Sequence, residues 1–240
     1  MKELAIIIPA YNEAKNIKKL ILLIYKLHKN VSIFIVDDSL DLNTSMAIED
    51  LKKKIIYIHR KKKLGRGSAV IRGLKEAYKN KNFNYFIEMD ADFSHRPEEI
   101  KNNIKKFKKK KLDLLISSRY LAQSKIYNWC SSRRIFSKLS SVLAKFLLQI
   151  PCTDYTNGFR IYSRKSTKLI IDKCGEIGDG FIILSEILLH IFINKYKIEE
   201  TKTIFVNRVR GSSSVTFLLI FQSLMGLFKL FFIKIISKWK

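Results

Sequence analysis

The chain has 240 residues, and its 46 basic residues against 21 acidic ones give a net charge of +25. This length accommodates one α/β domain with a full core and a short appendage. The charge indicates a polyanionic partner, such as a nucleic acid, an anionic membrane or a phosphorylated substrate. Only 11 of the basic residues are arginine. A lysine bias of the solvated surface explains much of the charge equally well.

Three cysteines, Cys130, Cys152 and Cys174, form no C-x-x-C pair. Their odd number favours reduced thiols in a cytosolic setting over a disulfide framework. The apolar run at residues 4–8 is too short for a signal peptide and leads directly into Pro9, so we expect none.

The first 120 residues alternate between predicted strands and helices. Strands are predicted at residues 5–8, 31–36, 55–58, 83–89 and 112–117. Helices are predicted at residues 13–27, 44–53, 68–78 and 97 to about 109. Short apolar runs between helices are typical of βαβ units. The predicted fold class is therefore α/β, a doubly wound, mostly parallel sheet flanked by helices.

A helix predicted at residues 132–150 has the pattern of a membrane-interface element. Its apolar stripe consists of Ile135, Phe136, Leu139, Val142, Leu143, Phe146, Leu147 and Ile150. Arg134, Lys138 and Lys145 lie on another face, as in a basic amphipathic helix at a membrane surface. An ordinary helix packed on the core would show the same stripe. A further helix is predicted at residues 180–192.

The apolar C-terminal tail is predicted to lie on the membrane. Its longest uncharged stretch, 215–228, is shorter than the roughly 20 residues that span a bilayer. We expect one or two interfacial helices, with Lys229 and Lys234 drawn to anionic headgroups. The predicted organisation is a main domain at residues 1–214, which includes the interface helix, and a membrane-associated segment at residues 215–240.

The most informative motif is the pair Asp90 and Asp92 at the end of a predicted strand. Side chains two positions apart on a strand point to the same face. Two carboxylates at the carboxyl end of such a strand can hold Mg²⁺ or Mn²⁺, and the metal can hold a diphosphate. A single Asp-x-Asp is more often only an acidic turn, so this interpretation depends on the other motifs.

The other loops carry polar motifs in a definite order. They are Pro9-Ala-Tyr-Asn-Glu13, Val36-Asp-Asp-Ser39, Leu64-Gly-Arg-Gly-Ser-Ala69, Ser118-Arg-Tyr120, Asp154-Tyr-Thr-Asn-Gly-Phe-Arg160 and Arg208-Val-Arg-Gly-Ser212. With the acidic pair, this ordered set resembles family 2 glycosyltransferases of the GT-A fold. More narrowly, it resembles the dolichol-phosphate (polyprenol-phosphate) mannose synthases. The resemblance covers nearly the whole chain to about residue 215.

The resemblance implies a pocket for the donor nucleotide. It assigns to this pocket Pro9, Tyr11, Glu13, Val36, Asp38, Lys63 and Asp90. Tyr11 can pack on a flat base, while Glu13 and Asp38 can accept hydrogen bonds from the base or ribose. The glycines that follow Lys63 permit close backbone approach at a helix N-terminus, which favours phosphate oxygens.

Asp90 and Asp92 are, by the same resemblance, the catalytic carboxylates that chelate Mg²⁺ or Mn²⁺. The metal neutralises the leaving nucleoside diphosphate. Ser94 occupies the place of a third ligand in some relatives, so a hydroxyl or water would serve instead. For His95, a structural role fits better than a ligand role.

A lipid phosphate is the expected acceptor. Its second pKa lies near ~6, so it is already an anion near pH 7 and needs cations rather than a general base. The resemblance assigns it to Arg119, Arg133 and Ser137, and gives Arg119 a catalytic role. Guanidinium groups suit a phosphate better than ammonium groups. The alternative is that Arg133 only extends from an amphipathic helix to the surface.

Two assignments are less defined. Glu186 matches an acidic family position and fits either a sugar contact or a structural ion pair. Arg208 matches a phosphate- or sugar-contacting position, but Ser214 stands where many relatives carry a lysine. The Gln-x-x-Arg-Trp segment of processive polysaccharide synthases is absent from the sequence, which argues against such an activity.

The resemblance therefore implies an inverting, metal-dependent transfer of mannose from GDP-mannose to dolichyl or polyprenyl phosphate. The product would be a β-linked lipid-phosphate sugar at the cytoplasmic face of a membrane, with the enzyme peripheral or monotopic. Another donor, such as UDP-glucose, is the alternative, and the need for a membrane partner subunit stays open. No nucleic acid partner is expected, because no nucleic-acid-binding motif appears. A basic nucleic-acid-binding protein and an inactive membrane adaptor are remote alternatives.

Overall fold

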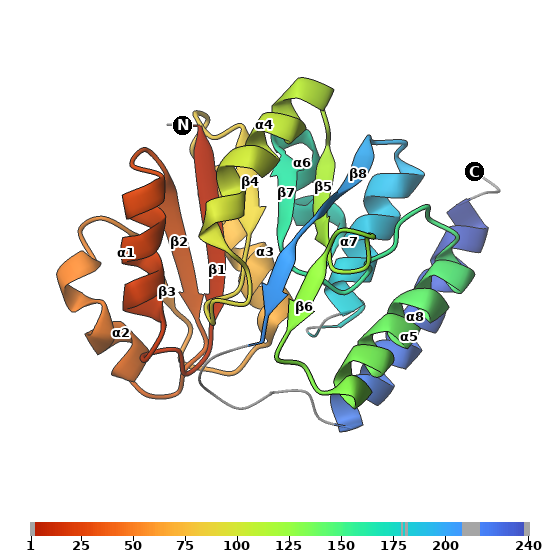
Figure 1. Cartoon of the computed structure of the whole chain (residues 1–240), viewed down its shortest axis with the longest axis horizontal. Helices are drawn as coiled ribbons and strands as arrows, with labels where there is room; N and C mark the ends of the chain where they lie inside the picture. Colours follow the sequence, from red (N-terminus) through yellow and green to blue (C-terminus); the bar gives the residue numbers. More distant parts are fainter. Residues whose placement is uncertain (1–2, 179, 181, 208–216, 238–240) are drawn as a thin grey trace.

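The computed structural model describes residues 3–178, 180, 182–207 and 217–237, with only the backbone for 217–220. Its centre is a seven-stranded sheet in the order β3-β2-β1-β4-β7-β5-β8 (Figure 1). The strands are β1 (Leu4–Ala10), β2 (Ser32–Asp37), β3 (Ile56–His59), β4 (Tyr85–Glu88), β5 (Leu114–Ser118), β7 (Arg160–Ser163) and β8 (Ile198–Lys202). A two-stranded sheet pairs β6 (Lys125–Tyr127) with β9 (Ile204–Val206).

Helices cover both faces of the large sheet (Figure 1). They are α1 (Ile17–Leu27), α2 (Asn43–Ala47), α3 (Arg66–Tyr78), α4 (Ile100–Lys110), α5 (Ser131–Leu148), α6 (Arg164–Lys173), α7 (Ile182–Ile193) and α8 (Phe217–Ser237). One core cluster lies between the sheet and α1 and α4, and the other between the sheet and α3, α6 and α7. The central strands are buried on both faces, as expected of a parallel sheet between two helical layers.

The predicted α/β class with a mostly parallel sheet is confirmed, but the prediction missed the strands β6, β7, β8 and β9. Strand β7 is antiparallel to both β4 and β5 and lies between them. No strand was predicted there because β7 follows a loop rather than a predicted helix and so shows no βαβ pattern. The pairing matters for the site, since it brings the Asp154–Arg160 motif beside the strand that carries Glu88.

Several predicted boundaries shift. Helix α1 begins at Ile17, so Glu13 lies in the preceding turn, where its carbonyl oxygen accepts from the backbone N–H of Ile17. The helix predicted at 44–53 is divided into α2 and a 3₁₀ turn, Glu49–Leu51. The C-terminal tail forms one helix, α8, across its described residues.

Helix α5 packs in an unusual way, because it buries small residues and exposes large apolar ones. Its buried residues are Ser141, Ala144 and Leu148. Its exposed apolar residues are Ile135, Phe136, Leu139, Val142, Leu143 and Phe146. The core-facing alternative is therefore wrong for these six residues of the stripe, whereas Leu147 and Ile150 of the same stripe join the core.

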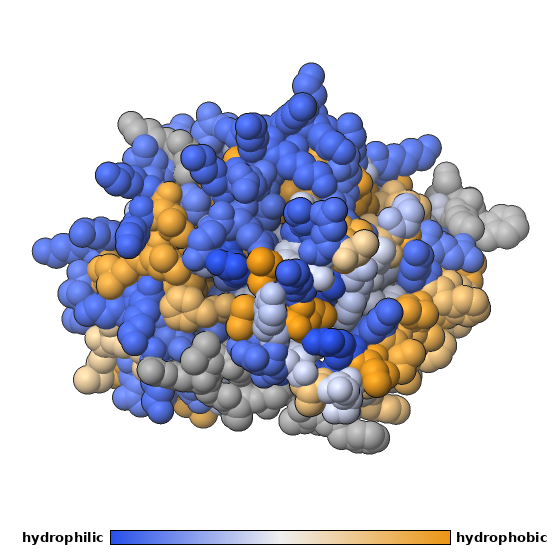
Figure 2. Space-filling view, in the orientation of Figure 1, coloured by the Kyte–Doolittle hydropathy of each residue, from blue (hydrophilic) through white to orange (hydrophobic). Residues whose placement is uncertain are grey.

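Helix α8 lies beside α5 and enlarges the same apolar surface (Figures 1 and 2). Its inner side joins the core through Leu227 and Leu230, and its exposed residues include Phe221, Phe228 and Phe232. We call the outward apolar residues of both helices the α5–α8 face. Among the described residues, no helix combines the length and apolar character needed to cross a bilayer.

One expectation about this face is wrong. Lys234 is buried, and its ammonium group donates to Oε1 of Gln149 at 2.8 Å, so it joins α8 to the end of α5 rather than facing lipid headgroups.

Candidate active site

The strand register brings the motif loops to one edge of the sheet. Pro9 of β1 pairs with Val36 of β2, and Ile7 of β1 pairs with Glu88 of β4. The parallel strands β1, β2 and β4 therefore end together. Strand β5 has the same direction, because both β4 and β5 are antiparallel to β7. Its end leads directly to Arg119.

The acidic loop after β4 is held by a histidine. The backbone N–H of Asp90 donates to Nδ1 of His95 at 2.9 Å, and Nε2 of His95 donates to Oδ1 of Asn157 at 2.9 Å. The His95 ring is buried and stacks on Phe159, with centroids 5.2 Å apart. Both ring nitrogens are thus used within the fold, which supports the structural role expected of His95.

The two predicted metal ligands differ in exposure. The Asp90 side chain is 26% exposed, whereas Asp92 is buried and accepts a hydrogen bond from the backbone N–H of Ser94 at 3.1 Å. Phe93, which follows Asp92, has a φ of 64°, a left-handed conformation that a bulky residue rarely adopts. Such strained positions persist only where the surrounding structure maintains them, and they are common at functional sites.

Arg66 lies against the acidic loop. It begins α3, and its Nη2 and Nε donate to Oδ1 of Asp90 at 2.7 and 3.0 Å. Its Nη1 donates to Glu88 at 2.5 Å, and the other Glu88 oxygen accepts from the Tyr162 hydroxyl at 2.6 Å. Burial disfavours the charged guanidinium, but Asp90 and Glu88 outweigh it and raise the pKa of Arg66.

Most of the predicted donor-pocket residues lie at or just after the carboxyl ends of β1 and β2. The Lys63 ammonium lies 4.6 Å from the centroid of the Tyr11 ring, so these two predicted residues are in contact. Asp38 is nearly buried and receives both Nε and Nη2 of Arg60, at 2.5 and 2.7 Å. It also accepts from the backbone N–H of Leu64 at 2.9 Å. Asp38 therefore fixes the loop before α3.

The remaining donor-pocket assignments have local structural partners. One Glu13 oxygen accepts from the Asn16 amide at 2.7 Å. Val36 is fully buried, so its contribution to a pocket is limited to shape. The neighbouring Asp37, which was not assigned to the pocket, accepts from the Ser39 hydroxyl and from the Tyr57 hydroxyl, at 2.5 and 2.6 Å, and orders the loop.

Arg119 is held by a buried carboxylate. Its Nε and Nη2 donate to the two oxygens of Asp154, both at 2.8 Å, and Nη2 also reaches Thr156 at 2.7 Å. Burial opposes both charges. Their mutual attraction nevertheless raises the pKa of Arg119 and lowers the pKa of Asp154. A bidentate pair of this kind fixes the direction of the guanidinium.

Trp129 brings the predicted acceptor residues together. The guanidinium carbons of Arg119 and Arg133 lie 5.3 and 4.6 Å from the centroid of this one ring, within cation–π range. The Tyr120 hydroxyl donates to the Ser137 hydroxyl at 2.7 Å. Three predicted phosphate contacts thus converge at the start of α5.

One predicted residue, Glu186, remains apart from this cluster. Glu186 is buried on α7, accepts from the backbone N–H of Gly175 at 3.1 Å, and belongs to no ion pair among the described residues. Burial raises the pKa of its carboxyl group. Its hydrogen bond indicates a role in ordering the loop before α7. Arg208 and Ser214 lie outside the described residues.

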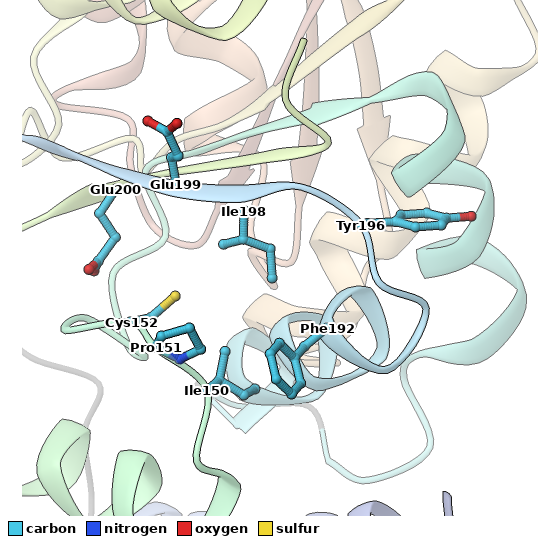
Figure 3. A pocket seen from close by; sticks show the side chains of 8 residues that line it. All are labelled: Ile150, Pro151, Cys152, Phe192, Tyr196, Ile198, Glu199 and Glu200. Carbon is cyan, nitrogen blue, oxygen red and sulfur yellow. The ribbon is translucent and has the colours of Figure 1, made fainter. Parts of the chain in front are cut away.

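A pocket on another part of the molecule contains none of the predicted site residues. Figure 3 shows its lining residues: Ile150, Pro151, Cys152, Phe192, Tyr196, Ile198, Glu199 and Glu200. Its carboxylates already have partners. Glu199 pairs with Lys110 at 2.8 Å, and Glu200 accepts from the backbone N–H groups of Thr153 and Asp154. Glu200 of this pocket therefore helps to hold the loop whose Asp154 binds Arg119.

Sequence reasoning missed the partners of the predicted residues. Arg60 and Trp129 were given no role, and Arg66, Asp154 and Asn157 were noted only within motifs. Arg60 and Asn157 each meet a partner at least 22 residues away in sequence. Charge complementarity in adjacent strand-end loops was the one available signal, because buried carboxylates require a cation or several hydrogen bonds.

The family is decided by a match over most of the domain. Residues 5–170 match the model described as glycosyl transferase family 2. The chain belongs to this family. It is therefore a glycosyltransferase. Its sequence is 28% identical over 215 residues to polyprenol monophosphomannose synthase of Mycolicibacterium smegmatis, covering 88% of this chain and 80% of the relative.

A second relative is longer than this glycosyltransferase. Dolichol-phosphate mannosyltransferase of Pyrococcus furiosus is 32% identical over 235 residues, covering 95% of this chain but only 63% of the relative. The chain thus spans less than two thirds of that protein.

Solved structures support the GT-A architecture. Glucosyl-3-phosphoglycerate synthase from Mycobacterium tuberculosis, in complex with Mn²⁺, UDP-glucose and phosphoglyceric acid, aligns with a TM-score of 0.69 at 16% identity. The alignment covers 95% of this chain and 79% of that one. At this identity the likeness shows the fold alone.

Proposed function

We propose that this glycosyltransferase transfers mannose from GDP-mannose to dolichyl or polyprenyl phosphate, with inversion at the anomeric carbon. The two curated relatives, one named for polyprenol and one for dolichol phosphate, support this substrate class. The single observation that carries the proposal is the position of Arg119 and Arg133. They share the Trp129 ring at the start of α5, whose apolar residues face outward.

This position suits a lipid phosphate better than a soluble sugar. A sugar hydroxyl needs a general base, whereas a phosphate monoester is ionised near neutral pH and needs positioning charges. Arg119 and Arg133 supply those charges, and the Ser137 hydroxyl lies with them. The lipid chain then has an apolar route along the α5–α8 face.

The donor would lie between this cationic cluster and the ends of β1 and β2. Tyr11 and Lys63 offer a ring and a cation for the base and phosphates. The Phe205 ring lies 5.8 Å from the His95 ring that holds the acidic loop and 5.4 Å from the guanidinium carbon of Arg119, so the acidic loop and the acceptor cluster are neighbours. A short path between the donor phosphates and the acceptor phosphate follows from this arrangement.

Asp90 and Asp92 suit a divalent ion. Asp90 already receives a cationic group, Arg66, and carboxylate oxygens are the ligands that Mg²⁺ and Mn²⁺ prefer. Among the described residues no group of three His, Cys, Asp or Glu side chains forms a metal site. Water and diphosphate oxygens would complete the coordination, as is common for Mg²⁺. The bound ion would supply positive charge for the leaving nucleoside diphosphate.

In this mechanism Arg119 and Arg133 orient the acceptor phosphate, and its ionised oxygen attacks the anomeric carbon directly. The bond to the nucleoside diphosphate breaks as the new bond forms. The Asp154 and Asn207 contacts limit the movement of the two guanidinium groups. We place the enzyme at the cytoplasmic face of a membrane, held there by the α5–α8 face.

The deciding experiment offers radiolabelled GDP-mannose and UDP-glucose separately with polyprenyl phosphate. We expect lipid-extractable label from GDP-mannose, and at least a tenfold loss with Arg133→Ala. Label from UDP-glucose alone would replace the donor but keep the acceptor. Label that enters only water-soluble products would contradict the lipid acceptor.

A further inference from the structure

Arg66 is a cation built into the acidic site. Its guanidinium makes three hydrogen bonds to Glu88 and Asp90, and its side chain is only 15% exposed. Glu88 is completely buried, and its two oxygens accept from the Arg66 guanidinium and the Tyr162 hydroxyl. Asp90 is more exposed and is one of the two carboxylates proposed to bind the metal.

A glycine far away in the chain makes room for this cation. A Cβ atom at Gly158 would lie 1.9 Å from Nη2 of Arg66 and 2.8 Å from its guanidinium carbon. Gly65, with a φ of 90°, sets the start of α3 immediately before Arg66. The backbone at Gly65 and at Gly158 therefore allows the Arg66 guanidinium to lie against Asp90.

A divalent ion at Asp90 and Asp92 would meet this guanidinium. Both cations would use the same carboxylate, and like charges on one carboxylate repel each other. A nucleoside diphosphate would change that balance, because its oxygens would give the guanidinium a second anionic partner at the N-terminus of α3.

We propose that Arg66 competes with the divalent ion for Asp90, and that a nucleoside diphosphate relieves this competition. This rests on the proposed role of Asp90 and Asp92 as a metal site. Metal and nucleotide then bind cooperatively, and the coupling is reciprocal. The metal site fills mainly when the donor is present.

The test measures Mn²⁺ binding by electron paramagnetic resonance, with and without GDP, and requires no turnover. For the unmodified chain we expect weak Mn²⁺ binding alone and about tenfold tighter binding with GDP, within the usual range of coupling. Arg66→Gln should bind Mn²⁺ alone about tenfold more tightly and lose most of the effect of GDP.

Two variants separate this role from a purely structural one. Arg72→Gln removes a charge from the same helix at a 47% exposed position and should behave like the unmodified chain. Gly158→Ala keeps the charge but displaces the flexible end of Arg66, and should tighten Mn²⁺ binding as Arg66→Gln does. It also provides the test if Arg66→Gln fails to fold.

Unchanged or weaker Mn²⁺ binding in both folded variants would overturn the proposal. The metal role in the proposed function fails in a different way. In that case the unmodified chain also binds no Mn²⁺, with or without GDP, and the competition proposed for Arg66 falls with it.

Discussion

The Asp154 carboxylate receives three hydrogen bonds from Arg119, from its backbone N–H at 2.9 Å and from Nε and Nη2 at 2.8 Å. Both side chains are buried. The position of the guanidinium in the acceptor cluster therefore depends on a residue 35 positions later in the chain.

Asp154→Asn should destabilise the fold and reduce activity, because it leaves a buried guanidinium without its counter-charge. We expect a loss of about 3–5 kcal/mol in the free energy of unfolding, measured by urea titration. Asp172→Asn, at a surface ion pair 41% exposed on the Asp172 side, is the matched control and should change little.

The same pair predicts a pH dependence. The pKa of Asp154 is lowered in the folded protein, since Arg119 outweighs the effect of burial. Its stabilising contribution is present above the ordinary aspartate pKa of about 3.9 and is lost as the pH falls through the lowered value. The stability difference between the unmodified chain and Asp154→Asn should therefore shrink below about pH 4. A constant difference across this range would contradict the assignment.

Asp92→Asn should reduce turnover about 100-fold or more, the size of effect expected for lost charge stabilisation of a leaving group. The amide keeps an oxygen that can accept the Ser94 backbone hydrogen bond, so the melting temperature should change little. Initial rates with Mg²⁺, Mn²⁺ or excess EDTA provide the measurement. Full turnover in excess EDTA would refute the metal role.

The product should be β-linked when the donor is α-linked. An ionised phosphate attacks in a single displacement, and the acceptor cluster around Arg119 and Arg133 supplies cations rather than a nucleophilic carboxylate. The anomeric configuration can be read from the one-bond C–H coupling in the NMR spectrum of the product. An α-linked product or a trapped glycosyl-enzyme would show a different mechanism.

The α5–α8 face should control membrane association. Leu139→Glu with Phe146→Glu places two charges at positions that are 60% and 77% exposed, so the fold should tolerate them. Liposome flotation and activity on a long polyprenyl phosphate should both fall, while activity on a short soluble acceptor persists. Leu22→Glu, 49% exposed on α1, should float normally.

Removal of residues 216–240 would be a less selective test of the same face. Leu227 and Leu230 are buried in the core, so truncation also uncovers part of that core. For the double variant Leu139→Glu with Phe146→Glu, normal liposome flotation would show that the α5–α8 face is not the membrane contact.

A single thiol should react in the native protein. Cys130 is exposed, and a hydrogen bond with the Ser132 hydroxyl lowers the pKa of its thiol. Burial raises the pKa of Cys152 to about 12 and that of Cys174 well above its ordinary value. Ellman's reagent should therefore titrate one thiol in buffer and three in denaturant. More than one fast thiol in buffer would mean that a buried cysteine is accessible.

Local pattern was enough to predict most strands and helices of the first 120 residues and to single out candidate site residues. Apolar runs in β1, β2 and β4 predicted their strands, because both faces of a parallel strand must be apolar. Asp90 and Asp92 could be proposed as site residues because side-chain alternation and the loop position follow from the strand alone. The stripe of α5 was visible, although its direction, outward or inward, was not.

Only the tertiary structure decided which charges meet. Arg66 faces Asp90, Arg60 faces Asp38 and Asp154 faces Arg119, at separations of 24, 22 and 35 residues. These pairings depend on the strand order, above all on β7 between β4 and β5, which no local period encodes. A period specifies which face of an element is apolar. What that face meets is set by how the whole chain closes around its core, so the outward stripe of α5 and the buried Lys234 could not be read from the sequence.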